Sequence, residues 1–566
     1  MTNNFSNTFI HGFSRMRPPT PKSNWLPYLL IVVAWVLTRA YPLTHLDHHL
    51  DWQVWESKKL LEYGFAERQG AIIDVHYMTG RVPEPAKFNY VNHPYPILWA
   101  DALAYYLGGH WGTVLFNSLL GLAGCLAVFP ALSGSFPRNE SLVGAMLFTI
   151  APSTVVFNVD ANTVALGALL WPLGVCLANR QRRLGEAGSA VPLGVAAFMC
   201  GQVSWFSYTV LPSLMGAGLG LGYQKDKGFT FNPRQKKMAV AVTLGGLVTL
   251  ALFIGQILYY TYDLKGDLSY LQRQAGSHDG MPAARMFFTI ALRAGLSLGP
   301  ALLAGTLVGL GQLRRLGSIG WLELSSMGYL LVFAGSALVL RRFFFREVHM
   351  YQYLVFPCTV LAVAGLQAIR RPLFTRLLLL LAVAGLSYPL LRFAIPLVSQ
   401  TTRNLGVAVS RISKPTEIVV TNLMDRQPPF AAWDVGSISY LNIICDRMFR
   451  ENTSSEKDLD GLLKSFRTGE LDMVFLYDKA LPLEGSLLEQ LRKSGQPESF
   501  QFATPEEPAT FATALRTYYW KLAGKHQLQI QGSDVKQQVE TEFEVYYFRL
   551  VKNDVGQAVI LPAKSR

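Results

Sequence analysis

The feature that most constrains this chain is a succession of apolar segments between residues 25 and 397, each about as long as a bilayer is thick. A helix needs roughly twenty mostly apolar residues to cross a membrane. The sequence offers roughly eleven such segments, at 25–43, 112–134, 141–158, 161–179, 190–207, 208–224, 238–260, 287–312, 319–340, 351–368 and 374–397. We therefore predict a polytopic α-helical membrane protein with about 11 transmembrane helices.

The composition changes after residue 397, where the chain takes on the character of ordinary soluble protein. Short apolar runs at 417–423, 472–478 and 541–551 predict strands, and 455–470 has the pattern of an amphipathic helix. Strand, helix and strand in succession favour a small α/β domain. The predicted organisation is an N-terminal cytoplasmic tail over 1–24, a transmembrane domain over 25–397 and a C-terminal soluble α/β domain over 398–566.

The distribution of positive charge predicts how the spans are oriented. The net charge is +13, but most Lys and Arg residues stand in short clusters between apolar runs, which argues against a nucleic-acid partner. If the N-terminus is inside, the inside loops contain Arg138, Arg180, Arg182, Arg183, Lys225, Lys227, Arg234, Lys236, Lys237, Arg314, Arg315, Arg370, Arg371 and Arg376. This topology places the long first loop, residues 44–111, and the C-terminal domain on the outer side. This topology requires residues 190–224 to form two segments rather than one, because a single span would move every later loop to the other side.

The first outer loop opens with a concentration of acidic residues and histidines, LTHLDHHLDWQVWESKKLLEYGF. Residues 51–61 have the spacing of a helix lying at the membrane surface, and Asp47, Asp51 and Glu56 stand at its start or within it. A solvated helix without chemistry is one interpretation. A metal site built from His45, Asp47, His48, His49 and Asp51 is another, although the spacing suits a single tetrahedral centre poorly.

Three further features lie at the predicted outer ends of spans. His93 and Pro94 precede an apolar helix, and proline is a normal residue at a helix start. Asp160 is a carboxylate at the mouth of a span, a position that favours function. Three cations lie at a predicted outer end, unlike the others: Arg341, Arg342 and Arg346. Their positive charge there indicates an anionic partner, either lipid headgroups or a phosphate-bearing ligand.

The order of these features resembles the GT-C superfamily of polyprenyl-phosphate-sugar-dependent glycosyltransferases, in particular bacterial relatives of protein O-mannosyltransferases and the aminoarabinose transferase of lipid A. The matching features are an acidic motif after the first span, KLLEYGF, the motif His93-Pro94-Tyr95-Pro96, and the basic and aromatic stretch FREVHMYQYLVFPCTVLAVAGL. The resemblance extends over residues 25–397. It implies a GT-C-like fold, and on its strength we expect a multi-pass protein of a bacterial inner membrane.

The resemblance also implies roles for individual residues. Asp51, or Asp47, would be the general base, and Asp160 the second acidic residue of the catalytic centre. Arg342, Arg346 and His349 would bind the donor phosphate, and His93, Glu56 and Tyr351 would contact substrate. The implied partners are a polyprenyl-phosphate sugar, an acceptor lipid, glycan or protein, and membrane lipids; no cofactor is required, and a divalent metal ion is left open.

Two other classes of function are compatible with the hydropathy pattern. A secondary transporter or lipid flippase would also have about eleven spans with scattered glycine and proline. A noncatalytic assembly subunit would use its C-terminal domain to bind envelope partners. The large outer loops and the scarcity of charges midway through the spans favour the glycosyltransferase.

Overall fold

The computed structural model describes the helical part of the chain almost continuously and six strands near the C-terminus. The described residues are 25–44, 52–72, 89, 91, 93–158, 164–184, 189–230, 236–261, 264, 283–313, 318–340, 344, 348–369, 371–387, 389, 409–410, 413–414, 418–421, 448–451, 473–478, 498–502, 543–552 and 558–561.

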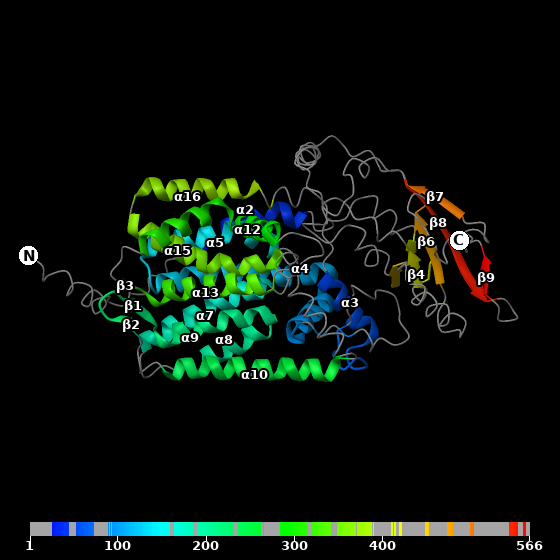
Figure 1. The fold of residues 1–566 in the computed structure, drawn as a ribbon, viewed down its shortest axis with the longest axis horizontal. Coiled ribbons are helices and arrows are strands. Elements are labelled where there is room, and N and C mark those ends of the chain that lie inside the picture. The colour runs from blue at the N-terminus through cyan, green and yellow to red at the C-terminus, as the bar shows by residue number, and fades with distance from the viewer. Residues whose placement is uncertain are drawn as a thin grey trace, which may run out of the picture.

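The helices coincide with the apolar segments of the sequence (Figure 1). In chain order they are α2 (Leu26–Thr44), α3 (Trp52–Tyr63), α4 (Tyr95–Ser133), α5 (Arg138–Ile150), α6 (Pro152–Phe157), α7 (Val164–Leu184), α8 (Val191–Gly201), η4 (Trp205–Val210), α9 (Leu211–Leu219), α10 (Lys236–Tyr260), α12 (Ala283–Leu313), α13 (Trp321–Val339), η6 (Val348–Leu354), α15 (Val355–Ile369) and α16 (Pro372–Gly385). Within the described residues, 5 helices are long and apolar enough to cross a membrane. The chain is therefore an integral, multi-pass membrane protein in its helical part, and the total of about eleven spans stays a prediction.

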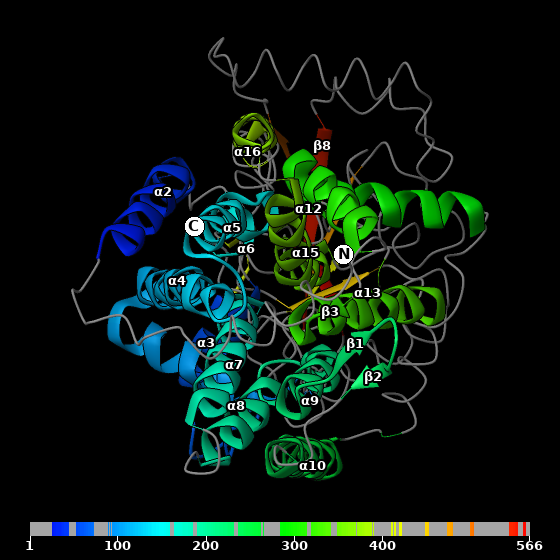
Figure 2. The same ribbon diagram turned by 90° about the vertical axis from the view of Figure 1, so that its left-hand side faces the viewer.

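Helix α15 occupies the centre of the bundle, with α5, α12 and α13 around it (Figure 2). Every residue from Val355 to Leu366 is buried. Close packing of α12 on α15 depends on small residues: a side chain at Gly309 would overlap the carbonyl oxygen of Leu361, and one at Gly305 would press on Ala362. Small residues let helix backbones approach where lipid offers no hydrophobic driving force.

Two ends of the bundle can be told apart (Figure 1). At one end, β1 (Gly222–Gln224) pairs antiparallel with β2 (Gly228–Thr230) and with β3 (Ser318–Ile319). We call this the hairpin end; it joins two of the loops predicted to lie inside. The other, the α3 end, carries α3 and the start of α4. The side of the membrane that each end faces stays a prediction.

The segment 190–224 forms two short helical stretches. α8 has 11 residues, and α9, with 9 residues, continues directly from the six-residue 3₁₀ helix η4. Gly194 near the start of α8 and Gly218 near the end of α9 both lie against the first turns of α10, whereas Gln202, between them, donates a hydrogen bond to Thr249 farther along α10. α8 and α9 are thus antiparallel, and the chain returns to the side from which it entered. The two separate segments predicted over 190–224 are thus present, and their crossing of the membrane stays a prediction.

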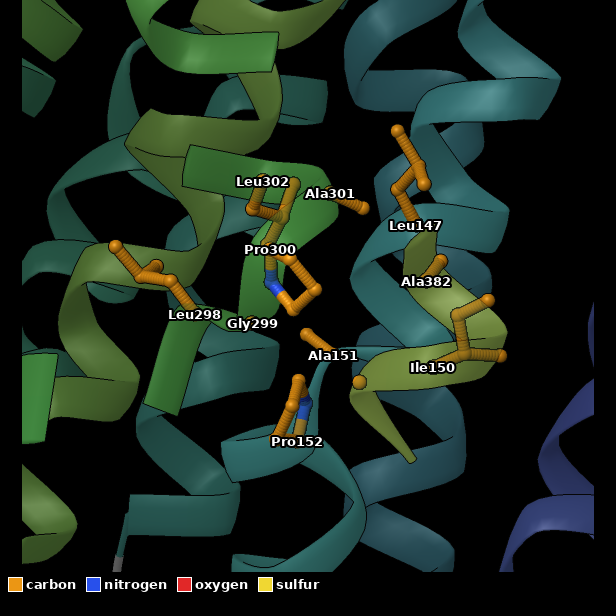
Figure 3. A pocket seen from close by; sticks show the side chains of 11 residues that line it. Leu147, Ile150, Ala151, Pro152, Leu298, Gly299, Pro300, Ala301, Leu302 and Ala382 are labelled. Atoms are coloured by element: carbon orange, nitrogen blue, oxygen red, sulfur yellow. The ribbon is translucent and has the colours of Figure 1, made fainter. Parts of the chain in front are cut away.

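Three helix breaks meet inside the bundle (Figure 3). α5 ends before Pro152, α12 is kinked at Gly299 and Pro300, and α16 ends at Gly385. Gly299 has φ +74°, which favours glycine, and a side chain there would press on the ring of Pro152. The small cavity between the breaks is lined by apolar residues such as Leu147 and has no group that could bind a charged substrate.

The C-terminal strands form one mixed sheet of order β5-β4-β6-β8-β7, with β9 paired to β8. β4 pairs in parallel with β5 and β6, and β8 pairs antiparallel with β6, β7 and β9. The strands are β4 (Ile418–Thr421), β5 (Met448–Glu451), β6 (Met473–Asp478), β7 (Glu498–Phe502), β8 (Phe543–Lys552) and β9 (Ala558–Leu561). The three strands predicted from the sequence are confirmed; the helix predicted at 455–470 lies outside the described residues, and the soluble nature of the domain stays a prediction.

Candidate functional site

The described part of the first outer loop packs at the α3 end. α3 lies against the first half of α4, with Leu60, Ile72 and Tyr95 in a shared apolar cluster. Glu56 and Lys59 on α3 are buried, with 0% and 2% of their surface exposed. The helix predicted at 51–61 is present as α3, and two of its charged side chains are enclosed rather than solvated.

α4 begins where the sequence predicts, with Pro94 as its N-cap residue and Pro96 in its first turn. It is kinked at Gly108 and Gly109. The part before the kink exposes Tyr106 and Leu107, and the part after it exposes Trp111. Such aromatic side chains are typical of the membrane–water interface. The kink thus divides α4 into a part that packs against α3 and a part that continues into the bundle.

Glu56 and His93 are close to the same side chain of the first turn of α4. Glu56 interacts electrostatically with Tyr95, and His93 is two residues before Tyr95 in the chain. Burial lowers the pKa of His93 to about 4. Its imidazole is therefore neutral at physiological pH and can donate or accept a hydrogen bond without adding positive charge.

The last turn of α10 holds this segment in place. Gln256 donates to the carbonyl oxygen of His93 at 2.8 Å and accepts from the N–H of Tyr95 at 2.9 Å. Tyr260 lies against Tyr95, with 4.9 Å between ring centroids. The carbonyl oxygen of Tyr260 accepts from Asn89 at 2.8 Å. The sequence analysis did not single out Gln256, because a polar residue near the end of an apolar helix is unremarkable without its tertiary contacts.

His349, in η6, lies beside the same part of the first outer loop. It interacts electrostatically with His93. The ring of Phe157, from the end of α6, packs edge-on at 6.4 Å between centroids. Gln352 in η6 donates to Asn158 at 3.3 Å, and both side chains are buried. The structure thus brings together His93 and His349, which the sequence analysis had assigned to separate motifs.

Tyr351 is part of the buried core of the bundle. Its side chain is fully buried and its hydroxyl donates to the carbonyl oxygen of Phe344 at 2.7 Å. The ring also packs near Phe333 of α13. The contact with substrate predicted for Tyr351 stays a prediction.

Arg293 is a buried cation that the sequence analysis missed. It lies in α12 on the N-terminal side of the kink at Gly299, is 1% exposed, and interacts electrostatically with Tyr351. A charged residue inside an apolar segment is a functional candidate by default, so its presence in the run ALRAGL was an available signal.

The remaining predicted site residues, Asp47, Asp51, Asp160, Arg342 and Arg346, lie outside the described residues. The same holds for His45, His48 and His49, the other members of the metal site considered from the sequence. Within the part of the chain that the structure describes, no three His, Cys, Asp or Glu side chains form a group suited to a metal ion.

No protein-family model and no curated protein matches this chain in sequence. Its fold, however, matches solved membrane glycosyltransferases. ArnT from Cupriavidus metallidurans, bound to undecaprenyl phosphate, aligns with a TM-score of 0.54 at 11% identity, over 86% of this chain and 97% of ArnT. The apo oligosaccharyltransferase of Archaeoglobus fulgidus also aligns with a TM-score of 0.54, at 10% identity, over 93% of this chain and 89% of that one.

Arabinofuranosyltransferase AftD from Mycobacteria aligns with a TM-score of 0.50 at 14% identity, over 91% of this chain and 39% of AftD. The chain thus has the fold of these solved membrane glycosyltransferases. The resemblance found in the sequence is confirmed at the level of the fold, and ArnT and the archaeal oligosaccharyltransferase match it over most of their length.

Proposed function

We propose that this protein is a membrane glycosyltransferase that moves a sugar from a polyprenyl-phosphate donor to an acceptor lipid, glycan or protein on the outer side of the membrane. The observation that carries the proposal is the electrostatic interaction between His93 and His349 at the α3 end. One belongs to the acidic, histidine-rich first loop and the other to the basic and aromatic stretch. The similarity in fold to ArnT, which was solved with undecaprenyl phosphate, supports a polyprenyl-phosphate donor.

The proposed reaction is a single displacement at the anomeric carbon. Asp51, or Asp47, takes the proton of the acceptor hydroxyl, whose oxygen then bonds to the anomeric carbon. The bond between that carbon and the phosphate oxygen breaks, so the configuration inverts and prenyl phosphate leaves with the negative charge. Prenyl phosphate is a good leaving group and needs no separate general acid.

We assign the other predicted residues to binding of the donor phosphate and of the substrate. Arg342 and Arg346 would stabilise the charge that develops on the leaving phosphate, since a guanidinium can bind it through two hydrogen bonds. His349 would contribute a hydrogen bond to the same phosphate. His93 and Glu56 would bind substrate on the opposite side, with Asp160 as the second acidic residue.

A transfer assay tests the proposal. Membranes containing wild-type protein, Asp51→Asn or Asp47→Asn are incubated with radiolabelled polyprenyl-phosphate sugars and an envelope extract. Label should reach an acceptor with wild type and be abolished in one of the two variants without loss of expression. Asp226→Asn, on the exposed turn at the hairpin end, is the matched control and should keep full activity. Normal turnover in both Asp51→Asn and Asp47→Asn would remove these residues from the mechanism.

A second comparison tests the phosphate-binding arginines. Arg346→Ala should weaken binding of undecaprenyl phosphate more than binding of the acceptor, whereas Arg183→Ala, at an exposed position at the end of α7, should change neither. Absence of any transfer in folded wild-type protein would instead favour a transporter or flippase, whose readout is movement of the lipid between leaflets.

A further inference from the structure

Gln256 supplies, from α10, the hydrogen bonds that the segment before α4 lacks locally. The first N–H groups of a helix have no partner within the helix. α4 has no side-chain cap of its own, and its N-cap residue, Pro94, has no N–H. The Oε1 of Gln256 accepts from the Tyr95 N–H, and the Nε2 donates to the His93 carbonyl oxygen. One side-chain amide therefore fixes the peptide groups on both sides of Pro94.

The surrounding contacts make α10 a firm support. Gln256 and Tyr260 are four residues apart, so they lie on one face of the helix. Tyr260 packs on the ring of Tyr95, and its hydroxyl donates to the carbonyl oxygen of Gln69 at 2.6 Å. α10 itself is a continuous helix of 25 residues. A site supported by a rigid helix keeps its geometry better than one supported only by a loop.

We propose that Gln256 is a positioning residue for the transfer reaction: by holding the His93 carbonyl and the Tyr95 amide, it keeps His93 beside His349, where acceptor and donor phosphate would meet. This inference rests on the proposed function. The side-chain amide of glutamine offers both the donor and the acceptor that the two peptide groups require at neutral pH. A carboxylate accepts from Tyr95 but cannot donate to His93, and an aliphatic side chain does neither.

Three variants separate this role from simple packing. Gln256→Leu removes both hydrogen bonds, and Gln256→Glu keeps the one from Tyr95. Thr249→Val is the control, since Thr249 lies two turns earlier on α10, is buried and interacts with Gln202 and Tyr208 rather than with the segment before α4. A displacement of about 1 Å at a reacting group can lower a rate by about 100-fold. We expect kcat to fall roughly 10- to 100-fold in Gln256→Leu, with the KM for the polyprenyl-phosphate sugar nearly unchanged.

The pH dependence of Gln256→Glu provides a readout that a packing role would not give. Once protonated, the glutamic acid has the donor and acceptor of the amide and can restore both hydrogen bonds. The kcat of Gln256→Glu divided by that of wild type at the same pH should therefore rise as pH falls from 8 to 5, whereas the ratio for Gln256→Leu stays flat. Using the ratio cancels ionisations common to both proteins, including those of His93, His349 and Tyr95.

Hydrogen exchange of purified protein in detergent gives a measurement independent of activity. The amide of Tyr95, followed in a peptide covering residues 91–99, should exchange faster in Gln256→Leu than in wild type or Thr249→Val. Unchanged exchange together with unchanged kcat in Gln256→Leu would overturn the inference. If Gln256→Leu exchanges faster but wild-type protein transfers no label, the result would support the contact and overturn the proposed function.

Discussion

Replacing Arg39 by methionine is expected to destabilise the helical bundle by about 2 kcal/mol. The guanidinium is fully buried in α2 and donates to the carbonyl oxygens of Thr149 at 2.7 Å and Thr154 at 2.9 Å. These carbonyls stand on either side of the break between α5 and α6, where Pro152 interrupts the helical hydrogen bonds. Arg39 thus holds the break that leads α6 toward Phe157 and the site.

The magnitude follows from two opposing terms. Leaving a buried carbonyl without a donor costs about 1–3 kcal/mol, so the two together cost about 4 kcal/mol. Removing a charge from the centre of a membrane helix returns roughly 2.5–3.5 kcal/mol. Arg39 lies near the end of α2, which ends at Thr44, so we take about 2 kcal/mol for this term. The difference is the expected loss.

Arg39→Lys distinguishes geometry from charge. Lysine retains the charge and its desolvation cost, but a single ammonium group does not reproduce the planar fork that reaches two carbonyls. We therefore expect Arg39→Lys to lose at least as much stability as Arg39→Met.

The assay is the midpoint of heat-induced loss of monodisperse protein in detergent. About 2 kcal/mol corresponds to a decrease of about 3 °C in a domain as large as residues 25–397. Arg183→Met, at an exposed position, should leave the midpoint unchanged. A wild-type midpoint for Arg39→Lys would refute the geometric argument, and a wild-type midpoint for Arg39→Met would show that the two hydrogen bonds contribute nothing net.

Two further predictions concern packing and pH. Gly309→Val should destabilise the protein by about 1–3 kcal/mol or more, because its side chain would overlap the backbone of α15, while Gly311→Ala, which meets no atom within 4 Å, should be neutral in the same heating assay. Burial lowers the pKa of His93 from about 6.5 to about 4. Between these two pH values the unfolded chain binds a proton at His93 more readily than the folded protein. The contribution of His93 to stability is therefore lost as pH falls through this range. His93→Asn should therefore lose less thermal stability between pH 7 and 5 than wild type; equal losses would contradict the burial of a neutral imidazole.

The sequence by itself determined where the helices and several strands lie. In a membrane, backbone groups must be satisfied within each segment, so a long apolar run such as 238–260 can hardly be anything but a helix. Proline is a normal residue at a helix start, which placed the start of α4 after Pro94. The alternation of apolar residues placed β8. These features depend on residues close to one another in the chain.

Tertiary structure alone decided how the segments combine into a site. The sequence predicts α8 and α9 as two apolar segments, and only their packing on α10 shows that they run antiparallel along one helix. The roles of Gln256 and Arg39 depend on carbonyl groups more than a hundred residues away. The proximity of His93 to His349 likewise has no local signature in the sequence, because hydrogen bonds and packing between distant segments are fixed only when the whole bundle has assembled.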